Sequence, residues 1–149
     1  MSNGANSKAF LGSGMSLLIG LNPQGQLVMN MGVDGNGQIP MSSYENHVRQ
    51  SILLILETAT GERVMRPSFG AGLQTIVFSP IGSATAALVQ HQVTDALTNF
   101  EPRIDVLGVQ VTQSSSEPGL LQIDLQYRVR QTDTMFNLVY PFFLERGAY

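Results

Sequence analysis

Residues 121–130 carry the pattern that most limits the fold of this chain. Apolar and polar residues alternate there five times, which is typical of a β-strand with one buried and one wet face. The apolar set is Leu121, Ile123, Leu125, Tyr127 and Val129, and the polar set is Gln122, Asp124, Gln126, Arg128 and Arg130. Residues 104–112 and 135–143 are strand-like too, and turn sequences separate them from this strand. The end of the chain therefore predicts a three-stranded antiparallel meander, with a bulge where Gly108 breaks the alternation.

Two helices are predicted before these strands. Apolar residues fall at helical spacing over residues 44–58, and Gly61 is placed to end that helix. A second helix is predicted over 83–100, because Pro102 prevents its continuation. The short apolar run 73–78 fits either a strand or a tight helical turn. Helices followed by strands predict an α+β fold, with two helices packed on the dry face of a three-stranded antiparallel sheet.

The N-terminal part has a different character. It opens with an arm rich in Ser, Asn, Gly and Ala, which we expect to be mobile or ordered by a partner. Two apolar runs, 15–21 and 26–31, flank an Asn-Pro-Gln-Gly turn and predict a hairpin, and a glycine-rich loop follows at 32–40. We therefore divide the chain into residues 1–41, the arm with its hairpin and loop, and residues 42–149, the α+β domain.

Charge is scarce in this chain. Charged side chains make up 13% of it, against the usual value of about 25%. Because the centres of protein interfaces are depleted of charge, this favours a surface that other proteins cover. The net charge is −3 and Lys8 is the only lysine, so no basic face that follows nucleic acid is expected. The absence of cysteine excludes disulfides and thiolate zinc sites.

No signal peptide and no membrane-spanning segment are predicted. The longest apolar run, residues 52–56, is far too short to cross a bilayer. The N-terminal residues lack a basic region followed by a long apolar run. We therefore expect the protein to be made in the cytoplasm and to stay soluble.

Charged residues cluster at the two junctions that follow the predicted helices, residues 61–70 and 101–103. The first junction contains the charged residues Glu62, Arg63 and Arg66. The second consists of Glu101, Pro102 and Arg103. We expect Glu62 and Glu101 to pair with the arginines of the first junction. The two junctions are then either internal staples, or part of the cluster faces outward, since arginine in a rigid loop is a good interface anchor.

Paired carboxylates such as Glu62 and Glu101 also hydrolyse glycosides, so a hydrolase is the alternative from another functional class. Each has an arginine close in sequence, which lowers a carboxyl pKa and is wrong for a general acid. His47 and His91 lie on different predicted helices, and no metal-ligand spacing or phosphate-binding loop is present. The sequence therefore predicts no catalytic residue, no metal and no cofactor.

The two junctions and the helix before them resemble a known family. Their motifs, in order, are the run 51–56, Thr58, Gly61-Glu62-Arg63, Met65-Arg66-Pro67, Phe69-Gly70 and Phe100-Glu101-Pro102-Arg103-Ile104. Over residues 43–143 the chain resembles the baseplate wedge family of contractile tails, whose members occur in contractile phages, type VI secretion and extracellular contractile injection systems. Residues 10–14 and the following apolar run are most like the injection-system branch, and the equivalent phage or type VI subunit is the alternative.

The resemblance implies a small non-catalytic wedge subunit, present in six copies around a central tube. Such subunits lie between the large wedge proteins and the first ring of sheath. They start sheath polymerisation by offering strands that the sheath's extended arms complete, which is β-augmentation. Some relatives have carried a lysozyme label, which nothing in this sequence supports.

The resemblance also implies the partners and the residues that bind them. The partners are sheath protein and the large wedge proteins, with central hub, spike or tube proteins as further candidates, and neither nucleic acid nor membrane. The Glu-Pro-Arg motif is the family's hallmark and is associated with the large wedge subunits, while the last strand fits the strand-donating role. The partner-binding residues expected here are Glu101, Pro102, Arg103, Glu62, Arg63, Arg66, Met135, Phe136, Val139 and Tyr140. The protein is expected in the baseplate of a contractile particle, cytoplasmic or released.

Overall fold

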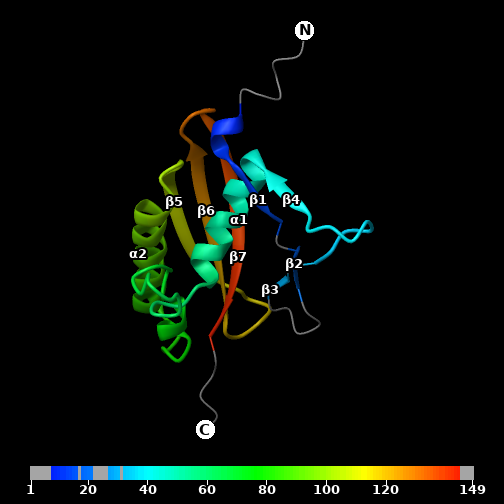
Figure 1. Cartoon of the computed structure of the whole chain (residues 1–149). Helices are drawn as coiled ribbons and strands as arrows, with labels where there is room; N and C mark the ends of the chain where they lie inside the picture. Colours follow the sequence, from blue (N-terminus) through cyan, green and yellow to red (C-terminus); the bar gives the residue numbers. More distant parts are fainter. Residues whose placement is uncertain (1–7, 17, 22–26, 31, 145–149) are drawn as a thin grey trace. The chain divides into compact units, whose positions relative to one another are not determined.

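The computed structural model describes residues 8–16, 18–21, 27–30 and 32–144 (Figure 1). The chain forms two compact units, Met1–Ile52 and Leu53–Tyr149, and the boundary falls inside helix α1, Tyr44–Glu57. The division at residue 41 that we expected from the sequence lies before this helix, and it stays a prediction about domains.

The first unit contains short strands. Its elements before α1 are η1 (Ala9–Leu11), β1 (Ser13–Met15), β2 (Leu18–Leu21), β3 (Leu27–Asn30) and β4 (Met41–Ser43). β2 and β3 pair antiparallel, which confirms the predicted hairpin, whose turn lies outside the described residues. β1 pairs antiparallel with β4 across the whole hairpin and glycine-rich loop, a pairing that the sequence did not predict.

Side chains tie the start of this unit to the N-terminal half of α1. The Lys8 ammonium contacts the Glu45 carboxylate, which holds the pKa of Glu45 below its ordinary value. The Gln50 side chain accepts a hydrogen bond from the Ser42 hydroxyl at 2.8 Å and donates one to Ser16 at 3.2 Å. These contacts give the short strands β1 and β4 an anchor on a helix.

The second unit is built on the predicted meander. Strands β5 (Ile104–Gln113), β6 (Leu120–Val129) and β7 (Thr134–Phe143) form a three-stranded antiparallel sheet in the order β5-β6-β7. The register shifts between Val106 and Gly108, so the bulge that Gly108 predicted is confirmed. The five apolar residues that alternate along β6 are all buried, which makes this strand the centre of the core.

Helix α2 (Ser83–Phe100) packs against β5 and buries Val89, Val93 and Leu97 (Figure 1). The run 73–78 contains the helical turn η2 (Leu73–Ile76), so the helical reading of that run holds. The last turns of α1 are joined to the sheet through Tyr140 of β7, whose hydroxyl donates to Glu57 at 2.5 Å. The predicted α+β class, with two helices and a three-stranded sheet, is confirmed.

Gly61 does not end α1, contrary to our expectation. The helix ends at Glu57, where the backbone N–H and the hydroxyl of Thr58 both donate to the carbonyl of Leu54. Gly61 lies further along, with φ of 87°, and its N–H donates to the carbonyl of Pro67. Its left-handed backbone therefore opens the loop that follows rather than closing the helix.

Candidate partner-binding surfaces

The first junction is a loop that is folded on itself. Glu62 places its Oε2 atom 2.9 Å from the backbone N–H of Ala59, which donates to it. Three backbone hydrogen bonds close smaller turns within the loop: Gly61 N–H to Pro67, Arg66 N–H to Arg63 and Phe69 N–H to Arg66. Since the Glu62 carboxylate caps its own loop, this residue serves local structure first.

The two junctions meet, but through aromatic rings rather than an ion pair. The Arg63 guanidinium carbon lies 4.1 Å from the centroid of the Phe69 ring, and the Phe69 and Phe100 centroids are 5.0 Å apart. Phe100 is the last residue of α2 and directly precedes the second junction. The expected pairing of Glu62 and Glu101 with Arg63 and Arg66 was wrong, because Arg63 stacks on Phe69 and each glutamate has a nearer partner.

The second junction is an internal ion pair. Arg103 donates from Nε to Oε1 of Glu101 at 2.6 Å and from Nη2 to Oε2, so both carboxylate oxygens are occupied. Glu101 is 2% exposed, whereas Pro102 is exposed and Arg103 is part-exposed. The carbonyl of Arg103 accepts from the N–H of Arg130 at the end of β6. The pair thus joins the end of α2 to the sheet, and Pro102 between them is left exposed.

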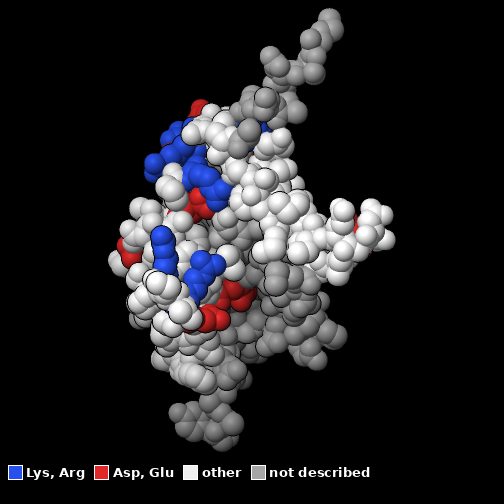
Figure 2. All heavy atoms as spheres, in the orientation of Figure 1, with Lys and Arg blue, Asp and Glu red and all other residues white. Residues whose placement is uncertain are grey.

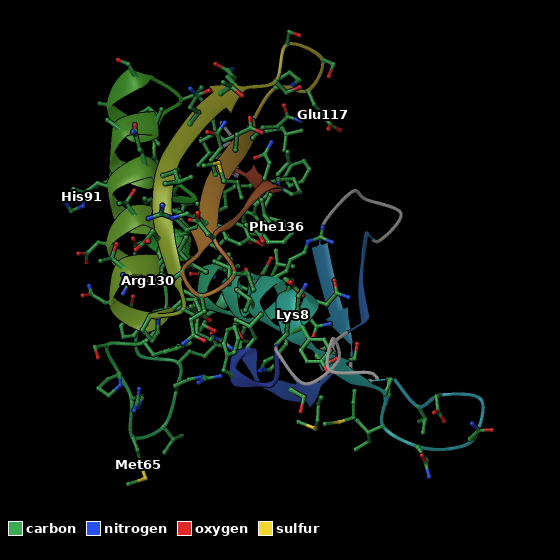
Figure 3. The ribbon with its side chains drawn as sticks, turned by 90° about the horizontal axis from the view of Figure 1, so that it is seen from above. Lys8, Met65, His91, Glu117, Arg130 and Phe136 are labelled. Atoms are coloured by element: carbon green, nitrogen blue, oxygen red, sulfur yellow. The ribbon has the colours of Figure 1, made fainter. Side chains whose placement is uncertain are left out.

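What the first junction exposes most is apolar. Val64 is 91% exposed and Met65 is 94% exposed, and Met65 has a left-handed φ of 65°. Met65 lies at the tip of the loop and points away from the ribbon (Figure 3). Sequence reasoning assigned neither residue to partner binding because it attended to the charges around them, although two apolar residues inside a polar loop are themselves a signal.

A second charged cluster joins β5 and β6 on the wet face of the sheet. Asp105 accepts from Arg128 at 3.0 Å and from Arg130 at 2.7 Å, and Arg128 also lies 3.3 Å from Asp133. The hydrogen bond from Arg128, with that from Arg130, holds the pKa of Asp105 below its ordinary value. On the face seen in Figure 2, basic and acidic side chains are interspersed.

The hydrogen-bond register determines which backbone groups of β7 face outward. The N–H of Leu144 donates to the carbonyl of Gly119, and this pair continues the register in which Phe142 faces Leu121 and Tyr140 faces Ile123. Because hydrogen-bonded pairs alternate along an antiparallel ladder, the even-numbered residues of β7 bond to β6. The backbone groups of the odd-numbered residues point away from β6, namely those of Met135, Asn137, Val139, Pro141 and Phe143. Among the described strands, none pairs with this outer edge.

The side chains of β7 divide in the same way. Met135 is 70% exposed and Val139 is 50% exposed, so both lie on the wet face beside the free edge. Phe136 is half-buried and stacks on Tyr127 with centroids 5.7 Å apart. Tyr140 is buried, and burial, followed by its hydrogen bond to Glu57, raises the pKa of its hydroxyl. Of the four β7 residues expected to bind a partner, only Met135 and Val139 present exposed side chains.

A cavity of about 590 Å³ lies between α2 and the segment 60–75, which includes the end of the first junction. Its lining includes Gly70, Gly72, Gln92 and Asp95, and neither Glu62 nor Glu101 is part of it. Within the described ranges, no three His, Cys, Asp or Glu residues are grouped as metal ligands are, and no helix combines the length and apolar character needed to span a bilayer.

Comparison with known proteins gives the family. Residues 42–134 match the family model of baseplate wedge protein gp25. The chain is 35% identical over 81 residues to baseplate wedge protein gp25 of Enterobacteria phage T4, a match covering 54% of this chain and 61% of the phage protein. It therefore spans less than two thirds of that relative.

Two solved structures have similar folds. One is a putative tail lysozyme from Geobacter sulfurreducens, with 50% identity and a TM-score of 0.66, covering 72% of this chain and 96% of the other. The other is a chain in the baseplate of the anti-feeding prophage, with a TM-score of 0.61, covering 94% of this chain and 91% of the other. The two sequences are 18% identical, so this likeness concerns the fold alone. Since the family model covers more than half of the sequence and both junctions, the chain belongs to the baseplate wedge protein gp25 family.

Proposed function

We propose that this protein is a non-catalytic baseplate wedge subunit of a contractile injection particle, and that it starts the sheath by pairing a sheath strand with the outer edge of β7. The observation that carries the proposal is the register of β7. The outward backbone groups of Met135, Asn137 and Val139 have no partner among the described strands, and exposed apolar side chains stand beside them. An unpaired edge of this kind is a template for strand addition.

Pro141 limits where the added strand can bind. It occupies an outward position and has no N–H, so the edge donates at Met135, Asn137 and Val139 and then has a gap. Each backbone hydrogen bond contributes about 0.5–1.5 kcal/mol net, so several in series are needed to resist the pull of a contracting sheath. We therefore expect the sheath strand to lie along residues 135–139.

The other edge of the sheet is a poorer template. The bulge between Val106 and Gly108 interrupts the regular ladder of β5, and bulges twist and blunt an edge. α2 also packs against β5, whereas no described strand pairs with the outer edge of β7. The asymmetry favours β7 as the docking strand.

The remaining predicted contacts place the subunit between other baseplate proteins. Pro102, Arg103 and the exposed side of the first junction, including Arg66, would face the large wedge proteins, with hub, spike or tube proteins as further neighbours. Six copies would surround the tube, and the protein would be made in the cytoplasm before assembly. The equivalent subunit of a contractile phage or a type VI baseplate is the second candidate, since the chain matches a baseplate wedge protein of phage T4 and shares its fold with a chain of a type VI secretion baseplate.

A tail lysozyme is the competing function, because a similar structure carries that description. The positions of the two glutamates speak against it here. Both oxygens of Glu101 are held by Arg103, Glu62 caps its own loop, and neither residue lines the cavity beside α2. We expect the purified protein to release no soluble fragments from peptidoglycan under conditions in which hen egg lysozyme does; release that Glu101→Gln abolishes would favour the lysozyme.

The sheath role is tested by Val139→Pro, which removes one outward donor and leaves the inner ladder intact. We expect baseplates that contain this variant to assemble but to carry no sheath in electron micrographs. Val139→Thr keeps the N–H and the β-branched shape, and it is the matched control that should give full-length sheaths. Normal sheaths on Val139→Pro baseplates would refute strand docking.

A further inference from the structure

The tip of the first junction combines features that do not suit a solvent-facing loop. Val64 and Met65 are adjacent, apolar and more than nine-tenths exposed, and Met65 has a left-handed φ that is uncommon for a residue with a side chain. A strained backbone persists only where the surrounding structure enforces it, and such strain is concentrated at functional positions. The loop therefore holds two apolar side chains out in the solvent.

The loop is held in this shape from several directions. Glu62 caps the N–H of Ala59, Arg63 lies over the Phe69 ring, and Gly61 and Pro67 close the base with a 2.8 Å hydrogen bond. Two of the three charged residues in the loop are thus used internally. A preorganised loop loses little conformational freedom on binding, which is the property of a good interface anchor.

Arg66 is the third charged residue of the loop, and its side chain has no such internal contact among the described residues. It directly follows Met65, its side chain is exposed, and it makes no ion pair with another described residue. A guanidinium beside an apolar tip is complementary to an apolar pocket with a carboxylate at its rim. A lipid surface is a poor match, because two aliphatic side chains and one arginine bury too little area for stable attachment.

We propose that Val64 and Met65 insert into an apolar pocket on a neighbouring baseplate protein, and that an acidic residue at the rim of this pocket pairs with Arg66. This contact rests on the proposed place of the chain in a baseplate, and it is independent of the strand that β7 offers. It moves the binding role of the first junction from Glu62 and Arg63 to the three residues that follow them.

The first test compares variants in competition. Wild-type chain and a variant with a different peptide tag are expressed at equal levels with the other proteins of the particle, and mass spectrometry measures their ratio in purified baseplates. Met65→Gln, which is polar and nearly the same size, should be incorporated at least about tenfold less than wild type. Met65→Leu should be incorporated within about twofold. Met41→Gln makes the same change at a residue that is 64% exposed elsewhere, and it should also compete equally.

The second test follows the natural methionine. Hydrogen peroxide oxidises exposed methionine to the sulfoxide, so Met65 of the isolated protein should react as fast as free methionine added to the sample. In intact particles we expect oxidation of Met65 to slow at least about tenfold relative to that free methionine. Equal rates in both samples would overturn the proposal, as would equal incorporation of Met65→Gln.

These outcomes separate the two contacts. If Met65→Gln is incorporated normally while Val139→Pro baseplates lack sheath, the loop contact is wrong and the sheath role stands. If Met65→Gln is excluded while Val139→Pro baseplates grow normal sheaths, the loop contact stands and the sheath role is wrong. Because Met65 makes no core contact, an unchanged melting temperature of purified Met65→Gln shows that exclusion reflects binding rather than misfolding.

Discussion

At the scale of single residues, the Glu-Pro-Arg motif forms an internal ion pair, a structural role that the sequence alone does not show. Glu101 is buried, and the Arg103 guanidinium donates a hydrogen bond to each of its two carboxylate oxygens. Removing one member of such a pair leaves a charge in a dry environment, which costs more than the pair itself contributes. The motif therefore stabilises the domain in addition to any partner it contacts through Pro102.

Arg103→Ala should lower the free energy of unfolding of the isolated protein by about 3 kcal/mol, because Glu101 is left buried without its counter-charge. Arg66→Ala, at an exposed arginine without an ion-pair partner among the described residues, should change it by less than about 0.5 kcal/mol. Urea denaturation of the two variants measures both. If Arg103→Ala unfolds at the wild-type midpoint but fails to assemble, the motif acts on partners alone.

Gly70 is required by the close approach of two backbone segments. Its φ is 113°, and a Cβ atom there would overlap the carbonyl oxygen of Thr58 at the end of α1. Gly70→Ala should therefore destabilise the protein by at least about 2 kcal/mol in thermal or urea unfolding. Gly35→Ala is the control, since nothing lies near that Cβ position, and it should be nearly neutral. Equal stability of the two variants would show that the 58–70 contact is not rigid.

At the scale of elements, the strand β7 has two distinct edges along one backbone. Leu138→Pro removes an N–H that bonds to β6, so it should destabilise the isolated protein by about 3 kcal/mol or more. Val139→Pro removes an outward N–H, as Pro141 already does, and should cost less than about 1 kcal/mol. Urea midpoints of the two proteins test the assignment, and a Val139→Pro protein as unstable as Leu138→Pro would reverse it.

The sheet and the helices could be predicted because their patterns are local. Two-residue alternation fixes β6, the break at Gly108 marks the bulge, and Pro102 limits α2. The pairing of β1 with β4 could not be predicted, since three-residue strands carry almost no periodic signal and their partners are far apart in sequence.

The candidate site was predictable in outline but not in its pairings. The motifs located both junctions, yet sequence alone could not show that Phe69 and Phe100 would come together and draw Arg63 onto a ring. Nor could it show which β7 side chains are exposed at the free edge. Tyr140 reads as an aromatic residue of the docking strand, but the strand alternation turns it inward to Glu57.

At the scale of the whole molecule, the account is that of a protein completed by its neighbours. Among the described residues, no strand pairs with the outer edge of β7, and the apolar tip at Val64 and Met65 is more than nine-tenths exposed. They lie on different elements of one unit, which suits a subunit that links two kinds of protein. The proposed strand addition at β7 is the central claim, because it would connect the baseplate to the sheath.

Hydrogen–deuterium exchange of single amides in the free protein and in assembled particles tests this claim most directly. The N–H groups of Phe136, Leu138 and Tyr140 bond to β6 and should be protected in both states. Those of Met135, Asn137 and Val139 should exchange rapidly in the free protein and slow at least about a hundredfold once sheath is attached. If these three amides exchange equally fast in sheathed particles, no strand is paired with β7 and the account is contradicted.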